Sequence, residues 1–379
     1  MGNSIVDYFI SLVQIDSESK QEKDVALKLE KDLTALGAEV KFDKANEKTG
    51  GNIGNLYAYL PGKKDKEPIL FCAHMDTVKS GIGIKPQILK DRITSDGTTI
   101  LGSDDKSGIA QIFWAIKEIS ENHITHAPIE IVFTVSEEKG LLGSKNLDYS
   151  LIKSKFGFAL DSRKVGSLAI GAPSENDLKI FVHGKEAHAG VEPEKGLNAI
   201  KIAAEAITKI PLGRIDEETT CNIGKIEGGK ATNIIPNYVK IEAEVRSHSE
   251  EKLQKITQQI SSIFKETASK YQVKNSDGKI IYAKVEIDIN KGYQSFRLKE
   301  DDEIIKLGHE ANKVLDLPCT TSIGGGGSDA NNFNQNAIKM AIVGTGMNSV
   351  HTVDEFILIS DLEKGAQWIK EVIRIYSQI

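Results

Sequence analysis

The chain has 379 residues, 40% hydrophobic and 27% charged, which is typical of a soluble globular protein and long enough for two domains. Its net charge of −6 is spread without any block of like charge, which argues against a nucleic-acid surface, and no apolar run is long enough to span a membrane. Three widely spaced cysteines without a C-x-x-C pair argue against a disulfide framework and favour a reducing cytoplasm: Cys72, Cys221 and Cys319.

The first part of the chain alternates helical and strand patterns. Residues 1–20 predict an amphipathic helix rather than a signal peptide, because the basic start is missing and Asp7 interrupts the apolar stretch. Apolar residues at helical spacing predict two further helices at 24–38 and 107–122. Apolar runs predict strands at 55–61, 68–74, 128–135 and 156–161. Such strands separated by helices predict an α/β sheet that is covered on both faces.

From about residue 175 the pattern changes to that of a different module. The expected elements are a strand at 177–184, a helix at 196–210, strands at 219–228 and 237–247, a helix at 250–271 and a strand at 283–290. This βαββαβ order is that of a ferredoxin-like module. The α/β pattern then returns, with helices at 302–316 and 360–379 and a strand at 339–346. We therefore expect one domain formed by 1–174 and 292–379, and an inserted domain formed by 175–291.

Histidine and carboxylate side chains follow one apolar run after another. They are His74 and Asp76, Asp104 and Asp105, Glu137 and Glu138, Asp161, and His351. Ligands of open α/β sheets bind outside the carboxyl ends of the strands. Each residue alone has an ordinary explanation as a solvated strand end, a helix N-cap or a surface charge. Together they supply two imidazoles and several carboxylates, which suits a pair of divalent cations of the zinc type.

A charge count supports two metal ions at this edge. Asp104, Glu138 and Asp161 contribute three negative charges, whereas two divalent ions contribute four positive ones. A bound hydroxide, the nucleophile that such a site generates near neutral pH, matches the remaining charge.

The spacing within two of these stretches suggests separate roles for neighbouring residues. Asp76 lies two residues after His74 and therefore on the same face of a strand, where it can fix the tautomer of the imidazole. Glu137 and Glu138 are adjacent and must point in different directions. One of them can bind metal while the other takes a proton from water and returns it to the leaving group.

Two other features of the sequence are given simpler interpretations. The glycine runs at 324–327 and 344–346 lack the strand–GxGxxG–helix order of a dinucleotide site, so we reject nucleotide binding. Cys72 is interpreted as a small buried residue, because histidines and carboxylates already fill both metal sites.

Seven motifs, in one order, resemble those of a known enzyme family. They are HMD, GSDDKSG, SEEKGLLGS, ALDS, HGKEAHAG, GGGSDAN and GTGMNSVHT. The sequence resembles, over about residues 7–375, the di-zinc exopeptidases that include peptidase T, carboxypeptidase G and the aminoacylases. The likeness is greatest to the peptidase T-like tripeptidase branch. The resemblance implies a zinc-exopeptidase-like catalytic domain with a mixed sheet between helices, and an inserted ferredoxin-like domain that acts as lid and dimerisation domain.

The resemblance also implies a role for each residue at the strand ends. The first metal would be bound by His74, Asp104 and Asp161, and the second by His351, Glu138 and Asp104. The family's Asp-x-Lys pattern selects Asp104 rather than Asp105 as the bridging ligand. Asp76 resembles the residue that orients His74, and Glu137 resembles the general base.

Further residues match substrate-contacting positions of the family. His188 resembles the histidine that stabilises the tetrahedral oxyanion, which acts either within its own subunit or on the partner's site. Arg246 has a physical rationale as well, because a guanidinium can hold a peptide carboxylate through two hydrogen bonds. The other expected substrate contacts are Asn233, Gly326, Ser328 and Asp329.

These expectations combine into one leading function. The chain is expected to be an aminotripeptidase that releases the N-terminal residue of short peptides, through attack by metal-bound hydroxide with Glu137 as general base. A carboxypeptidase or an N-acyl-amino-acid amidohydrolase with the same di-metal site is the alternative. A catalytically silent binding protein is disfavoured, because Glu137 and every expected ligand are present.

The expected partners follow from the same reasoning. The cofactor is two divalent ions, with zinc as the default and cobalt or manganese as the other metals that such ligands accept. The expected substrate is a short peptide, and the protein is expected to bind neither nucleic acid nor a membrane. The resemblance implies a homodimer through the lid domain, and the cysteines favour the cytoplasm.

Overall fold

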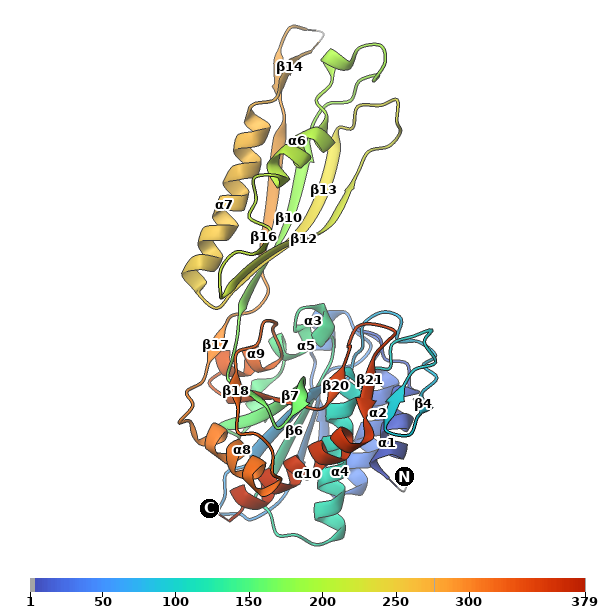
Figure 1. Ribbon diagram of the computed structural model, residues 1–379, viewed down its shortest axis with the longest axis vertical. Helices are drawn as coiled ribbons and strands as arrows, with labels where there is room; N and C mark the ends of the chain where they lie inside the picture. The colour runs from blue at the N-terminus through green and yellow to red at the C-terminus, as the bar shows by residue number, and fades with distance from the viewer. Residues whose placement is uncertain (1–3, 276, 379) are drawn as a thin grey trace. The chain divides into compact units, whose positions relative to one another are not determined.

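The computed structural model describes residues 4–275 and 277–378, and the chain divides into two compact units (Figure 1). The first unit comprises Met1–Ala172 and Phe296–Ile379, and the second comprises Pro173–Ser295. Strand β9 (Gly171–Ala172) pairs antiparallel with β17 (Phe296–Arg297), so the chain leaves and re-enters the first unit at neighbouring points. The second unit is therefore an insertion into the first.

A mixed eight-stranded sheet forms the centre of the first unit, in the order β1-β2-β6-β3-β7-β19-β8-β18. The strands are β1 (Glu39–Phe42), β2 (Leu56–Leu60), β3 (Ile69–His74), β6 (Ile129–Thr134), β7 (Phe156–Val165), β8 (Leu168–Ala169), β18 (Thr321–Ser322) and β19 (Lys339–Gly344). Strand β3 runs parallel to β6 and β7, and β7 runs parallel to β19. Every residue of β3 and β6 is buried, so these strands are covered on both faces, as predicted.

Helices surround this sheet. They are α1 (Ile5–Val13), α2 (Lys23–Ala35), α3 (Asn46–Thr49), α4 (Ser103–Glu121), α5 (Leu142–Lys145), α8 (Glu303–Val314), α9 (Ala330–Gln335) and α10 (Ile359–Tyr376). Helix α4 contacts β3 and β7, and α1 and α10 pack beside it. The Phe158 ring of β7 meets the Trp368 ring of α10 edge to face at 4.9 Å between centroids. A single core therefore joins the two sequence segments of this unit.

A small antiparallel sheet in the first unit was not expected from the sequence. Its order is β20-β21-β5-β4, with β20 (Met347–Asn348), β21 (Phe356–Leu358), β5 (Arg92–Thr94) and β4 (Gln87–Ile88). Strands of two or three residues are too short to give a periodic pattern. This sheet has a consequence for function, because His351 lies in the turn between β20 and β21.

The second unit is built on the sheet β11-β12-β13-β10-β16, and all its strand pairs are antiparallel. The strands are β10 (Ser174–His183), β11 (Gly213–Arg214), β12 (Thr219–Gly228), β13 (Tyr238–Ser247) and β16 (Lys284–Lys291), with helices α6 (Ala199–Ile207) and α7 (Glu250–Ser269). Strand β10 lies between β13 and β16, as in a ferredoxin-like fold, so the predicted βαββαβ module is confirmed. A hairpin of β14 (Gln272–Lys274) and β15 (Ile280–Tyr282) was not predicted.

The second unit has its own hydrophobic core. Alternate residues of β10 are buried there, and α7 buries residues at helical spacing. The α7 residues include Leu253, Ile256, Ile260 and Phe264. Within 4–275 and 277–378, no helix is long and apolar enough to cross a membrane.

Candidate metal centre and active site

The predicted metal ligands meet at the carboxyl ends of three neighbouring parallel strands. His74 is the last residue of β3, and it is paired in register with Thr134, the last residue of β6. Cys72 pairs with Ala159 of β7, so continuing this register by two residues brings His74 level with Asp161. The 3-10 turn Glu137–Lys139 follows β6 directly. One edge of the sheet therefore presents residues from three of the predicted motifs.

Asp104 faces two different imidazoles with its two carboxylate oxygens. Its Oδ1 lies 3.0 Å from His74 Nε2, and its Oδ2 lies 3.1 Å from His351 Nε2. The same His351 nitrogen lies 2.8 Å from Oε1 of Glu138. Ligand atoms of His74, Asp104 and Glu138 all lie within 4.8 Å of one another. A carboxylate with one oxygen toward each histidine has the arrangement expected of a bridge between two cations.

The hydrogen-bond partners of the two histidines indicate that these residues fit metal ions. His74 Nδ1 lies 2.9 Å from the carbonyl oxygen of Asp76, which can only accept a hydrogen bond, so a neutral His74 carries its hydrogen on Nδ1. The bare Nε2 then faces the Asp104 carboxylate, and two lone pairs in contact repel unless a cation or a proton lies between them. His351 Nε2 faces two carboxylates and has one hydrogen at most. Imidazole and carboxylate donors in this arrangement suit zinc-type ions.

The pKa values of the metal-free chain reflect the same arrangement. Hydrogen bonds to Asp104 and Glu138 raise the pKa of His351 to about 10. Burial raises the pKa of Asp161 to about 8, with the negative charge of Asp104 as the second cause. Burial also raises the pKa of Asp105 and of Glu137 above their ordinary values. The metal-free site thus binds protons where cations are expected, because it gathers more negative charge than its own side chains balance.

Asp76 makes contacts that differ in part from those expected. Its carboxylate was predicted to hold the His74 ring, but a carboxylate oxygen is 3.5 Å from Nδ1, whereas the backbone carbonyl oxygen of Asp76 is 2.9 Å from it. The fully buried carboxylate instead accepts the backbone N–H groups of Glu137 (2.9 Å) and Glu138 (3.3 Å), and the hydroxyl of Ser19 (2.7 Å). Asp76 therefore joins the end of β3 to the turn that presents both glutamates.

A buried glutamate that the sequence analysis missed supports the same turn. Glu22 is fully buried, and its Oε1 accepts hydrogen bonds from the backbone N–H of Ser136 (2.9 Å) and from its hydroxyl (3.1 Å). Ser136 has φ of 52°, in the left-handed region, and it directly precedes Glu137. The two bonds hold this unfavourable backbone conformation in place. No sequence signal distinguishes Glu22 from the many surface glutamates around it.

Lys106 was part of a family motif but received no role in the sequence analysis. Its side chain is 1% exposed, and burial lowers its pKa to about 8. Its Nζ donates to the hydroxyl of Ser17 (2.7 Å), which in turn donates to the carbonyl of Met75 (2.9 Å). Lys106 therefore ties the start of α4 to the segment between His74 and Asp76.

The glycine-rich segment before α9 has an exposed part and a buried part. Gly326 is exposed, whereas Ser328 and Asp329 are buried. Asp329 accepts hydrogen bonds from the hydroxyls of Ser144 (2.5 Å) and Thr134. Its carboxylate therefore anchors the start of α9 to the end of β6, and a substrate contact is better provided by the exposed glycines.

The expected oxyanion and substrate residues of the second unit form two groups. His188 and Asn233 are both exposed, and their loops meet where Ala189 N–H donates to the Asn233 carbonyl (3.0 Å). Nδ1 of His188 accepts the backbone N–H of Gly190 (3.2 Å), so a neutral His188 carries its hydrogen on Nε2. Nε2 is therefore free to donate to an oxyanion.

Arg246 lies on β13, apart from that pair of loops. Its Nε is 2.9 Å from a carboxylate oxygen of Glu175, and an Nη is 3.0 Å from one of Glu244. A substrate carboxylate would therefore compete with these two acids for the guanidinium.

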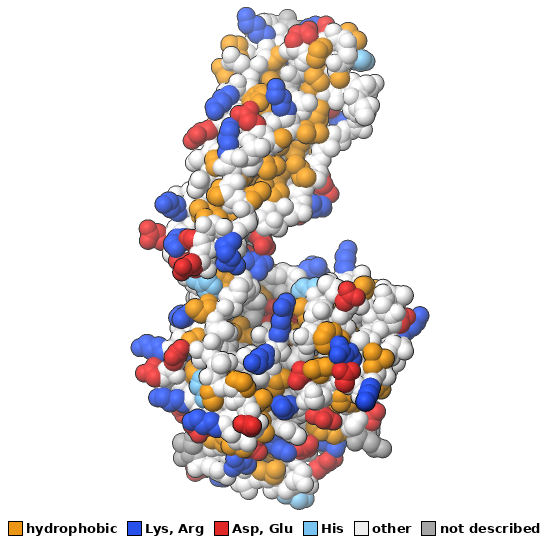
Figure 2. All heavy atoms as spheres, in the orientation of Figure 1, with side chains coloured by type: hydrophobic (Ala, Val, Ile, Leu, Met, Phe, Trp, Pro, Cys, Tyr) orange, Lys and Arg blue, Asp and Glu red, His pale blue; other side chains and the backbone are white. Residues whose placement is uncertain are grey.

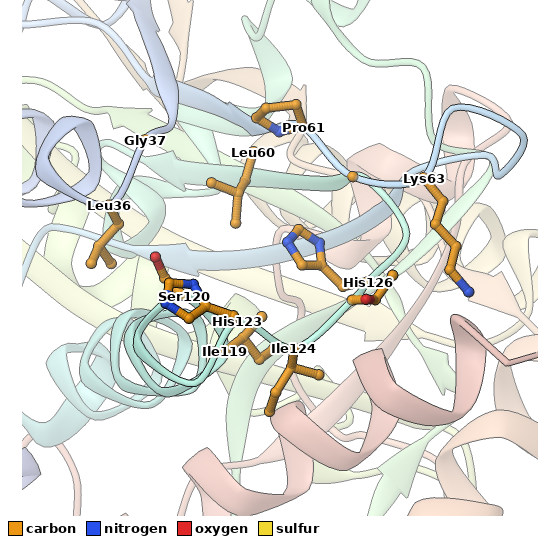
Figure 3. Close-up of a pocket in the computed structure, with 12 residues that line it drawn as sticks. Leu36, Gly37, Leu60, Pro61, Lys63, Ile119, Ser120, His123, Ile124 and His126 are labelled. Carbon is orange, nitrogen blue, oxygen red and sulfur yellow. The ribbon is translucent and has the colours of Figure 1, made fainter.

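A separate hollow of about 410 Å³ lies on the first unit, at the loop between α4 and β6 (Figure 3). Its lining combines apolar side chains with two imidazoles: Leu36, Leu60, Ile119, Ile124, His123 and His126. Its lining residues do not include any of the predicted metal ligands around Asp104. This hollow is therefore distinct from the candidate metal centre.

Two family models match the sequence. The model described as "Peptidase family M28" matches residues 55–177, and the one described as "Peptidase dimerisation domain" matches residues 176–272. The first range contains β2, β3, α4, β6 and β7, and the second lies within the inserted unit.

Individual proteins match over nearly the full length of the chain. The uncharacterized protein YqjE of Bacillus subtilis is 41% identical over 370 residues, which is 97% of each chain. A crystal structure of a tripeptidase from Staphylococcus aureus superposes with a TM-score of 0.92 at 36% identity, covering 99% of this chain and 98% of that one. Aminopeptidase PepT from Bacillus cereus gives a TM-score of 0.85 at 41% identity, covering 98% of each.

Fold and relatives together define the class of the protein as a metal-dependent exopeptidase, with a catalytic domain and an inserted peptidase dimerisation domain. Within this class, the chain belongs to the peptidase T-like branch of the M20 peptidase family. The resemblance and the fold class predicted from the sequence are confirmed.

Proposed function

We propose that the protein is an aminotripeptidase that removes the N-terminal residue from short peptides. The observation that carries the proposal is the Asp104 carboxylate, with one oxygen toward His74 and the other toward His351, beside the turn that holds Glu137. Two solved relatives with similar structures are named a tripeptidase and an aminopeptidase, which supports this choice of substrate.

Two divalent metal ions are the proposed cofactor. His74, Asp104 and Asp161 would hold the first, and His351, Glu138 and Asp104 would hold the second. Zinc is the first choice because the donors are imidazole nitrogen and carboxylate oxygen, and cobalt and manganese accept the same donors. When bound, such ions polarise the scissile carbonyl and lower the pKa of water.

Glu137 is the proposed general base and acid. Its side chain is 8% exposed and leads from a turn held through its own backbone N–H. Burial raises the pKa of Glu137, so its carboxylate holds a transferred proton more readily than an exposed one does. The carboxylate takes a proton from the attacking water and returns it to the nitrogen of the leaving amine. Asp76 serves this step as a positioning residue, because its carboxylate fixes the backbone of the turn.

Residues of the inserted unit are proposed to bind the substrate. His188 donates its Nε2 hydrogen to the oxyanion, within its own subunit or across a dimer. Arg246 exchanges its bonds to Glu175 and Glu244 for the free carboxylate of a short peptide. Asn233 and, in the first unit, the exposed Gly326 complete the proposed contacts, whereas the buried Ser328 and Asp329 hold the loop of Gly326 in place. A substrate held at its carboxylate must be short, which accounts for a preference for tripeptides.

Assembly and location are proposed on separate grounds. A homodimer through the inserted unit is supported by its match to the peptidase dimerisation domain and by hydrophobic side chains that gather on this unit (Figure 2). Its exposed hydrophobic residues include Val191, Ile226, Tyr238 and Ile289. A cytoplasmic location is supported by three cysteines that are all free.

A peptide panel tests the choice between an aminopeptidase and the two alternatives. The metal-loaded protein is given Leu-Gly-Gly, its N-acetyl form, its C-terminal amide, and the related di- and tetrapeptides. We expect release of leucine from Leu-Gly-Gly, with weaker cleavage of the amide and of the other lengths and none of the N-acetyl form. Release of C-terminal glycine instead would identify a carboxypeptidase, and preference for the N-acetyl form would identify an amidohydrolase.

A further inference from the structure

Glu355 is a buried acid outside the predicted ligand set, and it contacts the segment that presents Asp104. Its side chain is 1% exposed. Its Oε2 accepts the backbone N–H groups of Leu101 (2.8 Å) and Gly102 (2.9 Å). Its Oε1 accepts the hydroxyl of Ser103 (2.6 Å) and the backbone N–H of Asp104 (3.1 Å). One carboxylate therefore satisfies four donors of the turn that begins α4.

Glu355 also belongs to the hairpin that carries His351. The two residues are four positions apart, between β20 and β21 (Figure 1). These strands have only two and three residues, and the His351 side chain is 48% exposed. His351 is thus held by a short hairpin, and the buried carboxylate of Glu355 joins this hairpin to the Asp104 segment through four hydrogen bonds.

His74 and Asp161 have a different kind of support. They lie on β3 and β7, which are central, hydrogen-bonded strands of the main sheet. Strand β7 also contacts β20, but β3 and β7 are held mainly by their pairing with each other, with β6 and with β19. A change at Glu355 should therefore shift His351 relative to Asp104, whereas the relative positions of His74 and Asp161 should stay nearly the same.

We propose that Glu355 is a positioning residue for the second metal site, which holds His351 in reach of the bridging carboxylate of Asp104. The proposal rests on the two-metal assignment made above. A buried carboxylate is costly unless hydrogen bonds compensate for its lost hydration, and four donors to one group indicate a rigid connection. Residues that position metal ligands in this way typically change metal affinity by about 10-fold to 100-fold when they are replaced.

The chain offers a matched control in Glu130. It is fully buried on β6, and it accepts the backbone N–H of Ser154 (2.8 Å), the Ser154 hydroxyl (2.6 Å) and the hydroxyl of Tyr57 (2.7 Å). It lies near the beginning of β6, at the opposite end of the strand from the Glu137 turn. Replacing it removes a similar buried network without touching a predicted ligand.

The test measures zinc binding to the full-length metal-free protein by competition with a chromophoric chelator. We expect Glu355→Gln to weaken one of two sites by about 10-fold or more, and the other by less than about threefold. Glu130→Gln should leave both zinc affinities unchanged, even if it lowers the melting temperature as much as Glu355→Gln does. Ser103→Ala, which removes one donor to Glu355, should weaken the same site by a smaller factor. Excess zinc should restore kcat in Glu355→Gln. Such a rescue would not occur if the substitution simply prevented folding.

Several results would overturn the proposal. Unchanged affinities in Glu355→Gln, or the same change in Glu130→Gln, would assign Glu355 a purely structural role. Equal weakening of both sites would show that Glu355 acts through the bridging Asp104 and not through His351, which also overturns the proposal. A wild-type protein that binds a single ion would also reject it. Wild-type protein that binds two ions but cleaves no peptide would contradict the proposed function alone, because the zinc affinities of the variants would still decide the role of Glu355.

Discussion

At the scale of single residues, adjacent glutamates acquire different chemistry from one short turn. Asp76 binds the backbone N–H groups of both Glu137 and Glu138, so the turn is fixed while the side chains remain free to diverge. Glu138 reaches His351 at 2.8 Å. Glu137 makes no such contact with the histidines at hydrogen-bonding distance among the described residues, so it remains available for proton transfer.

Glu137→Gln separates proton transfer from metal binding. The amide keeps the size of the side chain but cannot take a proton from water, so we expect kcat to fall by about 10²-fold to 10⁴-fold. Metal content, measured on the same preparation by atomic emission, should equal that of the wild type. Glu138→Gln is the control, because it should lose metal as well as activity. Near-normal turnover of Glu137→Gln with its metal bound would contradict the assignment.

Arg246→Ala tests recognition of the substrate carboxylate. Charge-assisted hydrogen bonds contribute about 1.5–3 kcal/mol, so KM for Leu-Gly-Gly should rise by about 10-fold to 100-fold. KM for the C-terminal amide should change little. Arg214→Ala removes an exposed guanidinium of the same unit, which donates to the backbone carbonyl of Glu217, and it should leave both values unchanged. An equal rise of KM for acid and amide would count against a carboxylate contact.

The residues that could be predicted from the sequence are those next to a recognisable apolar run. His74 ends β3, and Asp161 follows the buried run of β7, and both positions are visible as a change from apolar to polar residues. Glu22 and Glu355 could not be found in this way. They are buried only because segments distant in sequence, around Ser136 and around Gly102, fold against them.

At the scale of elements, the long periodic segments matched their predictions and the short ones did not. Helices α7 and α10 bury residues at helical spacing, α4 is long and largely buried, and strands β3 and β6 are continuous buried runs. The sheet β20-β21-β5-β4 consists of two- and three-residue strands whose pairing is set by distant partners. It nevertheless positions His351, so part of the site depended on structure that no local pattern encodes.

The spacing of β3 and β7 depends on a glycine. A Cβ at Gly157 would lie 2.3 Å from the carbonyl oxygen of Leu70, on the neighbouring strand. We expect Gly157→Ala to force these strands apart and to lower the free energy of unfolding by about 1–3 kcal/mol, measured in urea. Gly224→Ala, on β12, is the matched control, since its nearest neighbour would be at an ordinary 3.7 Å. Equal stability of the two variants would show that the close approach is relaxed in solution.

At the scale of the whole molecule, each of the two units has its own hydrophobic core, and only the first unit contains the metal ligands. The ligands around Asp104 belong to the first unit, and the core that includes Phe264 belongs to the second. Metal ions stabilise only the unit that binds them, by about 2.7 kcal/mol for one site when free metal is 100 times Kd. The sequence predicted the insertion because the order of its elements, βαββαβ, interrupts an α/β pattern.

Removal of metal should therefore lower one calorimetric transition and leave the other in place. We expect a chelator to lower the melting temperature of the first unit, because the buried carboxylates then repel one another. Phe264→Ala should do the converse, destabilising the second unit by about 3–5 kcal/mol through the cavity it leaves. Both treatments acting on one shared transition would contradict independent cores.

The most direct test of the central claim is a metal titration of activity. Metal-free protein is titrated with zinc while the release of leucine from Leu-Gly-Gly is followed. A two-metal aminotripeptidase predicts negligible release without zinc and a rise that reaches its maximum at two equivalents per chain. Full activity in the rigorously metal-free protein, or release of C-terminal glycine in place of leucine, would contradict the account.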